Sequence, residues 1–293
     1  MRPDDWHLTE DVDDFLARAG GFLRSRPALH VTPLTAIQRL RTRGAAAYGT
    51  QAPLFGRLER AGEVRATLHR LPSLGLGLTP LTPEQADILA AHLASLGHSL
   101  PYVSATHDTA TAFAEAWQRH TGATPALRTR IRLYRLGTLT PPQPVPAGRG
   151  RPVGEQDHEQ LMRWCREFAT DVGEAVTIDA GSWAGTRFAD KRFTFWESPD
   201  GTPVSMAGVN PMVAGVIQVD PVYTPAHLRG RGYAGAATVE VSRAALAAGA
   251  TDVVLHANPA NPTSNALYQR IGYRPVTEWA VYDFAYAEPE VAQ

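Results

Sequence analysis

The sequence predicts an α/β protein with a mixed sheet (α+β), built from two similar halves within one chain of 293 residues. Residues 216–257 read in order as strand, Gly-rich turn, helix and strand, which is the pattern of a right-handed βαβ unit. The expected elements follow the same order in residues 1–140 as in residues 151–288. Between these halves, residues 141–150 are rich in proline and glycine, as in a semi-extended linker. Together these observations indicate a tandem fold with two similar domains.

The first half is expected to begin with two helices, followed by a hairpin and by alternating strands and helices. Its helices carry apolar residues at three- to four-residue spacing, and the hairpin turns at Ala61-Gly62. Thr82 and Gln85 are spaced as a capping box, with Pro83 in the first helical turn. The expected helices are 11–26, 33–43, 82–96 and 110–120, and the expected strands are 53–58, 64–69, 74–78, 102–105 and 127–136.

The second half repeats that order of elements. Its two early strands flank the turn Asp200-Gly201, and the apolar run 252–257 suits a parallel strand buried on both faces. Asn261 can cap a last helix, Pro262 suits the first position of that helix, and Gly272 suits its end. The expected helices are 155–169, 234–248 and a short one after Asn261, and the expected strands are 192–196, 204–209, 216–219, 222–224 and 252–257.

Composition indicates a soluble globular protein and gives little sign of a charged macromolecular partner. Apolar residues make up 44% of the chain and charged residues 19%, and the net charge of −1 provides no general attraction to nucleic acid or to a membrane. Neither a secretory signal nor an apolar run of membrane-spanning length is evident, so we expect a cytoplasmic protein. A monomer and a homodimer are both compatible with the sequence.

The residues that commonly hold metals or form disulfides are sparse. Cys165 is the only cysteine, which excludes an internal disulfide, and the ten histidines are scattered, so we expect no metal. Lys191 is the only lysine. We attribute this bias toward arginine to genome composition and not to function.

The segment between residues 216 and 235 is the strongest functional signal. Gly230 and Gly232 stand where a strand gives way to a helix, so unpaired backbone N–H groups and the positive end of the helix dipole meet there. Arg229 and Arg231 add full positive charges. The turn therefore predicts an anion site, and a phosphate group is the natural ligand.

A dinucleotide site is the first alternative, because Gly230, Gly232 and Gly235 satisfy the spacing G-x-G-x-x-G. The context of the glycines opposes it. Residues 225–228 separate the strand from the glycines, and Asp252 opens the next strand where the dinucleotide pattern requires an acidic residue at its end. A dehydrogenase is therefore disfavoured.

Two motifs in this half resemble those of the GNAT superfamily of N-acetyltransferases. Arg229-x-x-Gly232-x-Ala234 is similar to the acyl-CoA signature of that superfamily, Arg/Gln-x-x-Gly-x-Gly/Ala. The run 261–273, which is rich in asparagine at its start and ends in Gly-Tyr, looks like the closing motif. The resemblance covers about residues 151–287. It implies a mixed sheet that holds acetyl-CoA between two splayed central strands.

The resemblance also implies which residues bind acetyl-CoA. The pantetheine arm is expected to pair with the strand segment 222–224, and the diphosphate with the turn 229–234. An N–H group of the strand segment would also stabilise the oxyanion formed on the thioester. The residues expected to contact acetyl-CoA are Val222, Tyr223, Thr224, Arg229, Gly230, Arg231, Gly232, Tyr233, Ala234, Asn261, Ser264 and Tyr268.

Tyr268 is the expected general acid. A phenol with a pKa near about 10 remains protonated at neutral pH and can donate to the departing thiolate. For the general base three residues stay open, namely Asp220, Glu174 and His256, and ordered water is a fourth choice. The acceptor is expected to be a small-molecule or peptide amine, bordered by residues 174–187 with Trp183 and by Trp196.

The first half departs from the GNAT pattern where acetyl-CoA would bind. Its corresponding helix starts at Thr82-Pro83-Glu84, so an N–H donor is missing and a negative charge lies where a diphosphate would sit. Trp117 falls near the position of the proton-donating tyrosine. We therefore expect residues 1–140 to form a degenerate, non-catalytic GNAT-like domain, followed by the linker 141–150 and the N-acetyltransferase domain 151–288.

Two function classes follow from the sequence. The first is an acetyl-CoA-dependent N-acetyltransferase that moves the acetyl group to a primary amine by direct attack, with Tyr268 as general acid. The second is a non-catalytic acyl-CoA-binding or sensor protein that uses the same turn.

Overall fold

The computed structural model describes residues 6–44, 48–72, 74–174 and 176–287. The chain forms two compact units, which we describe separately. One unit extends to Arg132 and also includes the segment from Thr277 onward, and the other is Leu133–Val276. The units therefore do not follow the sequence ranges 1–140 and 151–288, because the last strand segment of the chain is built into the first unit.

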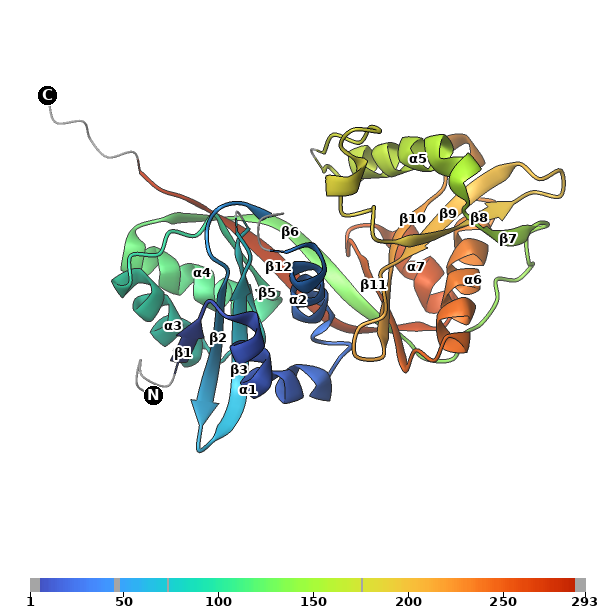
Figure 1. Cartoon of the computed structure of the whole chain (residues 1–293). Coiled ribbons are helices and arrows are strands. Elements are labelled where there is room, and N and C mark those ends of the chain that lie inside the picture. The colour runs from blue at the N-terminus through green and yellow to red at the C-terminus, as the bar shows by residue number, and fades with distance from the viewer. Residues whose placement is uncertain (1–5, 45–47, 73, 175, 288–293) are drawn as a thin grey trace, which may run out of the picture. The chain divides into compact units, whose positions relative to one another are not determined.

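The first unit contains a mixed sheet with strand order β1-β2-β3-β4-β5-β12-β6. Figure 1 labels the strands of this unit other than β4, together with helices α1, α2, α3 and α4. The elements of this unit are β1 (Trp6–Thr9), α1 (Val12–Ser25), α2 (Val31–Arg43), β2 (Leu54–Arg60), β3 (Glu63–Arg70), β4 (Leu76–Leu78), α3 (Pro83–Ser95), β5 (Tyr102–Thr106), α4 (His107–Thr121), most of β6 (Thr124–Leu136) and most of β12 (Tyr273–Ala285).

Local sequence signals account for several boundaries in the first unit. The capping box at the start of α3 is confirmed, since Thr82 Oγ1 accepts the N–H of Gln85 at 3.2 Å and Gln85 Oε1 accepts the N–H of Thr82 at 2.9 Å. Strand β1 was not expected from the sequence. Strand β12 is the final strand implied by the repeated order of elements, although no bounds were predicted for it, and it pairs antiparallel with β5 from Trp279 opposite Thr106 to Asp283 opposite Tyr102.

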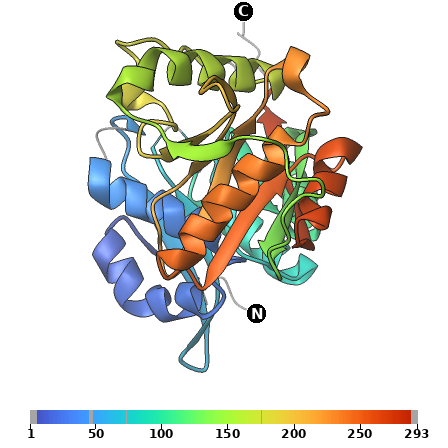
Figure 2. The same cartoon turned by 90° about the vertical axis from the view of Figure 1, so that its right-hand side faces the viewer.

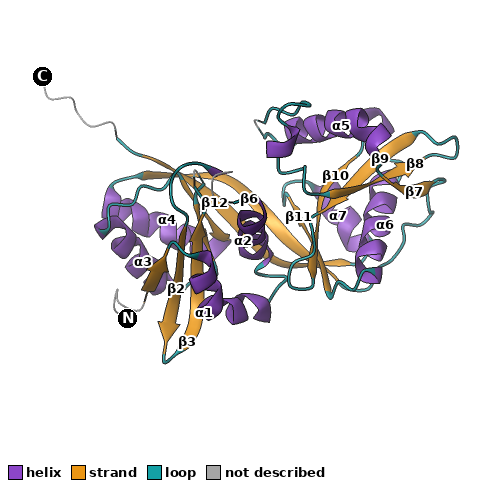
Figure 3. Cartoon of the chain, in the orientation of Figure 1, coloured by secondary structure: helices purple, strands orange, loops and turns teal. Residues whose placement is uncertain are grey.

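The second unit has the strand order β6-β11-β10-β9-β8-β7, in which β10 and β11 are parallel. Strand β7 begins inside the segment expected to be a linker. Figure 3 distinguishes the helices of this unit from its strands. The elements are β7 (Arg149–Pro152), α5 (His158–Asp171), β8 (Arg192–Glu197), β9 (Pro203–Val209), β10 (Val216–Tyr223), α6 (Tyr233–Ala247), β11 (Asp252–Ala257) and α7 (Pro262–Arg270).

Helices cover both faces of this second sheet. Apolar residues of α6 and α7 pack with Ile217, Val219, Val253 and Leu255 in one core cluster. Residues of α5 pack with Phe193 and Phe195 of β8 in another cluster. In Figure 2, where this unit faces the viewer, α6 lies along the strands. Successive residues of a strand point to opposite faces, so the two clusters lie on opposite sides of the sheet.

In the described part of the chain, no helix is both long and apolar enough to cross a membrane. Within the same residues, no group of three or more His, Cys, Asp or Glu side chains is arranged to hold a metal ion.

Candidate functional site

The site lies where the two central parallel strands of the second unit stop pairing. β10 and β11 pair from Val216 opposite Asp252 to Val219 opposite Leu255, and both strands continue beyond that point. The pairing of β10 with β9 also shifts register between Val219 and Val222, which places a bulge at Asp220. Asp220 and His256 are thus the first residues beyond the last β10–β11 pair.

A cavity of about 740 Å³ opens at this point. Its lining includes every residue that the sequence predicts to contact acetyl-CoA, together with Asp220 and His256. Glu174 does not line it. The lining residues that the sequence analysis did not single out for binding or chemistry are Phe168, Asp171, Val172, Val219, Leu228, Gly235, Ala257, Asn258, Thr263, Leu267 and Arg270.

The Gly-rich turn provides one wall of the cavity. Gly230 has a φ of +78° and Gly232 a φ of +83°, a left-handed conformation that L side chains rarely adopt. At the start of α6 the first main-chain hydrogen bond runs from the N–H of Ala236 to the carbonyl oxygen of Gly232, at 3.1 Å. The preceding N–H groups of α6 therefore have no acceptor among the described residues, and they remain available to an anion.

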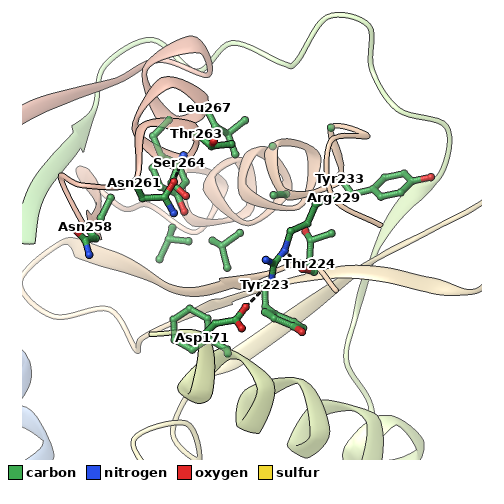
Figure 4. A pocket seen from close by; sticks show the side chains of 18 of the residues that line it. Asp171, Tyr223, Thr224, Arg229, Tyr233, Asn258, Asn261, Thr263, Ser264 and Leu267 are labelled. Carbon is green, nitrogen blue, oxygen red and sulfur yellow. Dashed lines mark hydrogen bonds and ion pairs between the residues drawn. The ribbon is translucent and has the colours of Figure 1, made fainter. Parts of the chain in front are cut away.

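Arg229 braces this turn. Its Nε donates to the carbonyl oxygen of Thr224 at 2.9 Å, and its Nη2 donates to Asp171 Oδ2 at 2.5 Å. In Figure 4 Asp171 reaches from α5 toward Arg229. The side chain of Arg229 thus connects the end of β10, the turn and α5.

The start of α7 provides the opposite wall. Asn261 Oδ1 accepts the N–H of Ser264 at 3.0 Å, so the predicted N-cap is confirmed. Figure 4 shows Asn261, Thr263 and Ser264 together at this end of the cavity. Asn265 donates to the carbonyl oxygens of Asn258 at 2.8 Å and of Asn261 at 2.6 Å, which ties the helix to the end of β11.

Tyr268 lies on α7 and lines the cavity, with 8% of its surface exposed. Its ring packs against those of Tyr134 and Tyr273, at centroid distances of 6.3 and 6.2 Å. Within the described residues its hydroxyl makes no hydrogen bond. Burial, and next the negative charge of Asp220, raise the pKa of Tyr268 above its ordinary value, so the phenol stays protonated.

Asp220 belongs to a buried charge network. Lys191 Nζ lies 2.6 Å from Asp220 Oδ2, and Arg187 bonds both this carboxylate and Glu174. Burial on its own would raise the pKa of Asp220, but the positive charges of Lys191 and Arg187 hold it well below its ordinary range. Asp220 is therefore an ionised carboxylate with little affinity for a proton.

Glu174, the other carboxylate considered as a base, belongs to the same network. Arg187 Nη2 donates to Glu174 Oε1 at 2.7 Å, and Arg187 Nε donates to Glu174 Oε2 at 3.0 Å. Residue 175, inside the segment expected to border the acceptor, lies outside the described residues.

His256 lies beside this network. Its Nδ1 is 3.1 Å from the side-chain nitrogen of Gln218. Burial lowers the pKa of His256 to about 4, against the opposing effect of the Asp220 charge. The imidazole is therefore neutral at neutral pH.

Two parts of the site had only faint sequence signals. Lys191, the lone lysine, has a side chain only 1% exposed, and it connects Asp220 to Asn210, with Nζ 2.6 Å from Asn210 Oδ1. The one lysine of this arginine-rich chain is thus buried in a charge network, which the composition alone could not show. Asp171 ends the first helix of this half, and no local pattern separates it from an ordinary surface carboxylate.

The comparisons with known proteins agree with the fold. Residues 211–280 match the family model described as FR47-like protein. The chain is similar to the GCN5-related N-acetyltransferase from Sphaerobacter thermophilus, with a TM-score of 0.56, 16% identity and 96% of each chain covered. It is also similar to the GNAT-family acetyltransferase from Colwellia psychrerythraea, with a TM-score of 0.57, 10% identity, and 95% of this chain and 98% of that chain covered.

A third similar structure is a tandem GNAT protein from the clavulanic acid biosynthesis pathway. Its TM-score is 0.52 at 13% identity, with 97% of this chain and 99% of that chain covered. A comparison with curated proteins found no similar sequence. The predicted tandem GNAT fold is confirmed. The family model matches the part of the chain that contains both motifs of the sequence resemblance.

Proposed function

We propose that this protein is an acetyl-CoA-dependent N-acetyltransferase, which moves an acetyl group to a primary amine by direct attack on the thioester. One observation carries the proposal: the open N–H groups of the Gly-rich turn and the hydroxyl of Tyr268 line the same cavity, at the point where β10 and β11 part. The GNAT fold supports the use of an acyl-CoA.

The cavity can hold acetyl-CoA in one direction. The diphosphate would lie on the N–H groups at the start of α6, beside Arg229 and Arg231. The pantetheine arm would run along residues 222–224, on the edge of β10 that no longer pairs with β11. Asn261 and Ser264, at the start of α7, would contact it from the other side. This direction brings the thioester to Tyr268.

In the reaction the amine nitrogen forms a bond to the acyl carbon, and the C–S bond then breaks. A backbone N–H of residues 222–224 would stabilise the oxyanion, although Pro221, just before them, has no N–H to offer. Negative charge develops on the sulfur as it leaves, and the Tyr268 hydroxyl donates its proton there. The phenol is suited to this role because burial keeps it protonated and no described residue occupies its hydroxyl.

The attacking ammonium must first lose a proton. Asp220 and Glu174 are both held in ion pairs with Arg187, and the positive charges of Lys191 and Arg187 hold the pKa of Asp220 well below its ordinary range. An ordered water in the cavity is the base most consistent with these contacts. The negative charge of Asp220 would then influence the transfer of the proton to water, but its carboxylate would not accept that proton.

For the first unit we propose a structural role without acetyl-CoA binding. The polar backbone groups of Leu81, just before α3, are already occupied by a side chain. Thr109 Oγ1 accepts the N–H of Leu81 at 2.9 Å and donates to the carbonyl oxygen of Leu81 at 3.3 Å. Both groups belong to the segment between β4 and α3, the counterpart of the segment between β10 and α6. Pro83 and Glu84 oppose a diphosphate at the start of the following helix.

The test is a screen of acceptors that follows release of free thiol from acetyl-CoA. Primary amines, from small molecules to peptides, are offered, and acetylation of one class with stoichiometric thiol release is expected. The second candidate, an acyl-CoA-binding or sensor protein, is favoured by the ion-paired state of both carboxylates. Saturable acetyl-CoA binding without thiol release across all amine classes would decide for that candidate.

A further inference from the structure

Four side chains next to the cavity form a hydrogen-bond chain whose direction is determined from one end. Lys191 is the starting point, because its ammonium has three donors and no acceptor. Its Nζ lies 2.6 Å from Asn210 Oδ1, and the Asp220 carboxylate at 2.6 Å from the same Nζ stabilises the ammonium. The atom of Asn210 that faces Lys191 is therefore the oxygen.

The amide nitrogen of Asn210 then faces the next residue. Asn210 Nδ2 donates to Gln218 Oε1 at 3.1 Å, and the backbone N–H of Asn210 donates to the carbonyl oxygen of Gln218 at 2.9 Å. With its Oε1 taken, Gln218 presents its Nε2 to His256 Nδ1 at 3.1 Å. An amide nitrogen can only donate, so His256 Nδ1 must accept.

A neutral imidazole that accepts at Nδ1 carries its proton on Nε2. The neutral state itself is supported by the burial that lowers the pKa of His256 to about 4. His256 Nε2 has no partner among the described residues, while the ring lines the cavity at the first position beyond the last β10–β11 pair.

We propose that the relay from Lys191 through Asn210 and Gln218 holds His256 as the Nε2–H tautomer, so that His256 serves acetyl transfer as a hydrogen-bond donor to an oxygen of the reacting groups and not as a proton acceptor. Two oxygens fit this donor: the carbonyl of the acetyl thioester, or an oxygen carried by the acceptor molecule. Asn210 and Gln218 are positioning residues in this scheme, because they act through His256. The role of the His256 Nε2–H group in acetyl transfer rests on the proposed function, whereas the assignment of the tautomer does not.

The tautomer is measured first, by nitrogen chemical shifts in protein labelled at histidine. His256→Gln removes the relevant signals from the spectrum and so assigns them. At neutral pH we expect a protonated Nε2 and an unprotonated Nδ1 in the unaltered protein. A proton on Nδ1, or a doubly protonated ring, would overturn the proposal whether or not the protein is an enzyme.

Reversal of the relay is the second measurement. In Gln218→Glu the carboxylate can only accept, so the ring must place a proton on Nδ1. Asn210→Asp should do the same through Gln218, whose amide would turn, and this variant decides the matter if the first does not fold. Gln85→Glu, in the exposed capping box of α3, is the matched control and should leave His256 unchanged. Unchanged His256 signals in the folded relay variants would contradict the proposed direction.

Kinetics separate a donor from a base. Glutamine retains an N–H donor but has no basic nitrogen, so His256→Gln should lose less turnover than His256→Phe. The phenylalanine variant should lose roughly two- to twelve-fold, as expected for one hydrogen bond. Loss of a general base would cost both variants about 10² to 10⁴. Equal losses of that size, or no loss in either variant, would refute the donor role.

The two oxygen sources give different binding results for His256→Phe. If the thioester carbonyl is the partner, affinity for acetyl-CoA falls and affinity for CoA does not. If the oxygen belongs to the acceptor, both affinities remain and the KM of the acceptor rises. Either pattern supports the donor, and the absence of both contradicts it.

Discussion

Replacement of Tyr268 by phenylalanine is the sharpest test of the proposed chemistry, because it removes a single oxygen atom from a buried ring. The ring would still pack against Tyr134 and Tyr273, and the hydroxyl makes no hydrogen bond within the described residues. We therefore expect the free energy of unfolding to change by no more than about 0.5 kcal/mol. Acetyl-CoA affinity should also change little, since the contacts of the diphosphate and pantetheine lie elsewhere.

Turnover should respond very differently. Loss of a general acid costs roughly 10² to 10⁴ in rate, which is about 3 to 5 kcal/mol of activation free energy. Thiol release from acetyl-CoA measures turnover, calorimetry measures affinity, and urea unfolding measures stability. A Tyr268→Phe enzyme that keeps turnover within threefold of the original would refute the assignment of Tyr268 as general acid.

Tyr273→Phe is the matched control. The hydroxyl of Tyr273 lies 2.7 Å from Ser242 Oγ, and Tyr273 does not line the cavity. Its removal should cost about 1 to 3 kcal/mol of unfolding free energy and leave turnover nearly unchanged. The two tyrosines should thus give opposite results, one in rate and the other in stability. Equal loss of turnover in both variants would point to a packing effect on α7.

Three further predictions follow from the structure. Calorimetric titration should find one acetyl-CoA bound per chain, and a stoichiometry of two would refute the structural role of the first unit. Lys191→Met should lower the free energy of unfolding by about 3 kcal/mol, the lower end for a broken buried pair, because Arg187 still holds Asp220; urea unfolding with no loss would contradict the buried network. Burial lowers the pKa values of His69 and His256 to about 4, below the value of about 6.5 in the unfolded state. As the pH falls, the unfolded state therefore binds protons before the folded state does. The free energy of unfolding should fall between about pH 6.5 and about pH 4, by up to about 3 kcal/mol for each histidine. Urea midpoints that stay level between pH 7 and pH 5 would exclude this linkage.

Local patterns were sufficient for most elements of the fold. The apolar spacing of residues 234–248 and the run 252–257 led to α6 and β11 within one residue of their observed ends. Caps at Thr82 and Asn261 were readable because they depend on residues three positions apart. Strands β1 and β7 were not anticipated, since each is only four residues long and pairs with a strand distant in sequence. The final strand, β12, was implied by the repeated order of elements but was given no bounds.

The Gly-rich turn and the capped helix that line the cavity were also largely readable from the sequence, since both are short contiguous signals. The hydrogen-bond relay was not, although His256 itself was a candidate base. Lys191, Asn210, Gln218 and His256 come from separate segments, and none of them differs locally from an ordinary core or surface residue. Their functional meaning depends on which atom faces which, at distances near 3 Å.

The sequence by itself determined the fold class of this protein, with two α/β halves, and it located a Gly-rich turn and a tyrosine on the helix that follows the next strand. Those features arise from backbone conformation and periodicity, which act over a few residues. Only the tertiary structure decided that the last strand completes the first unit, that both candidate carboxylates are ion-paired, and that His256 faces an amide donor. Charge pairing and hydrogen-bond direction arise between side chains brought together by folding, so no local stretch of sequence contains them.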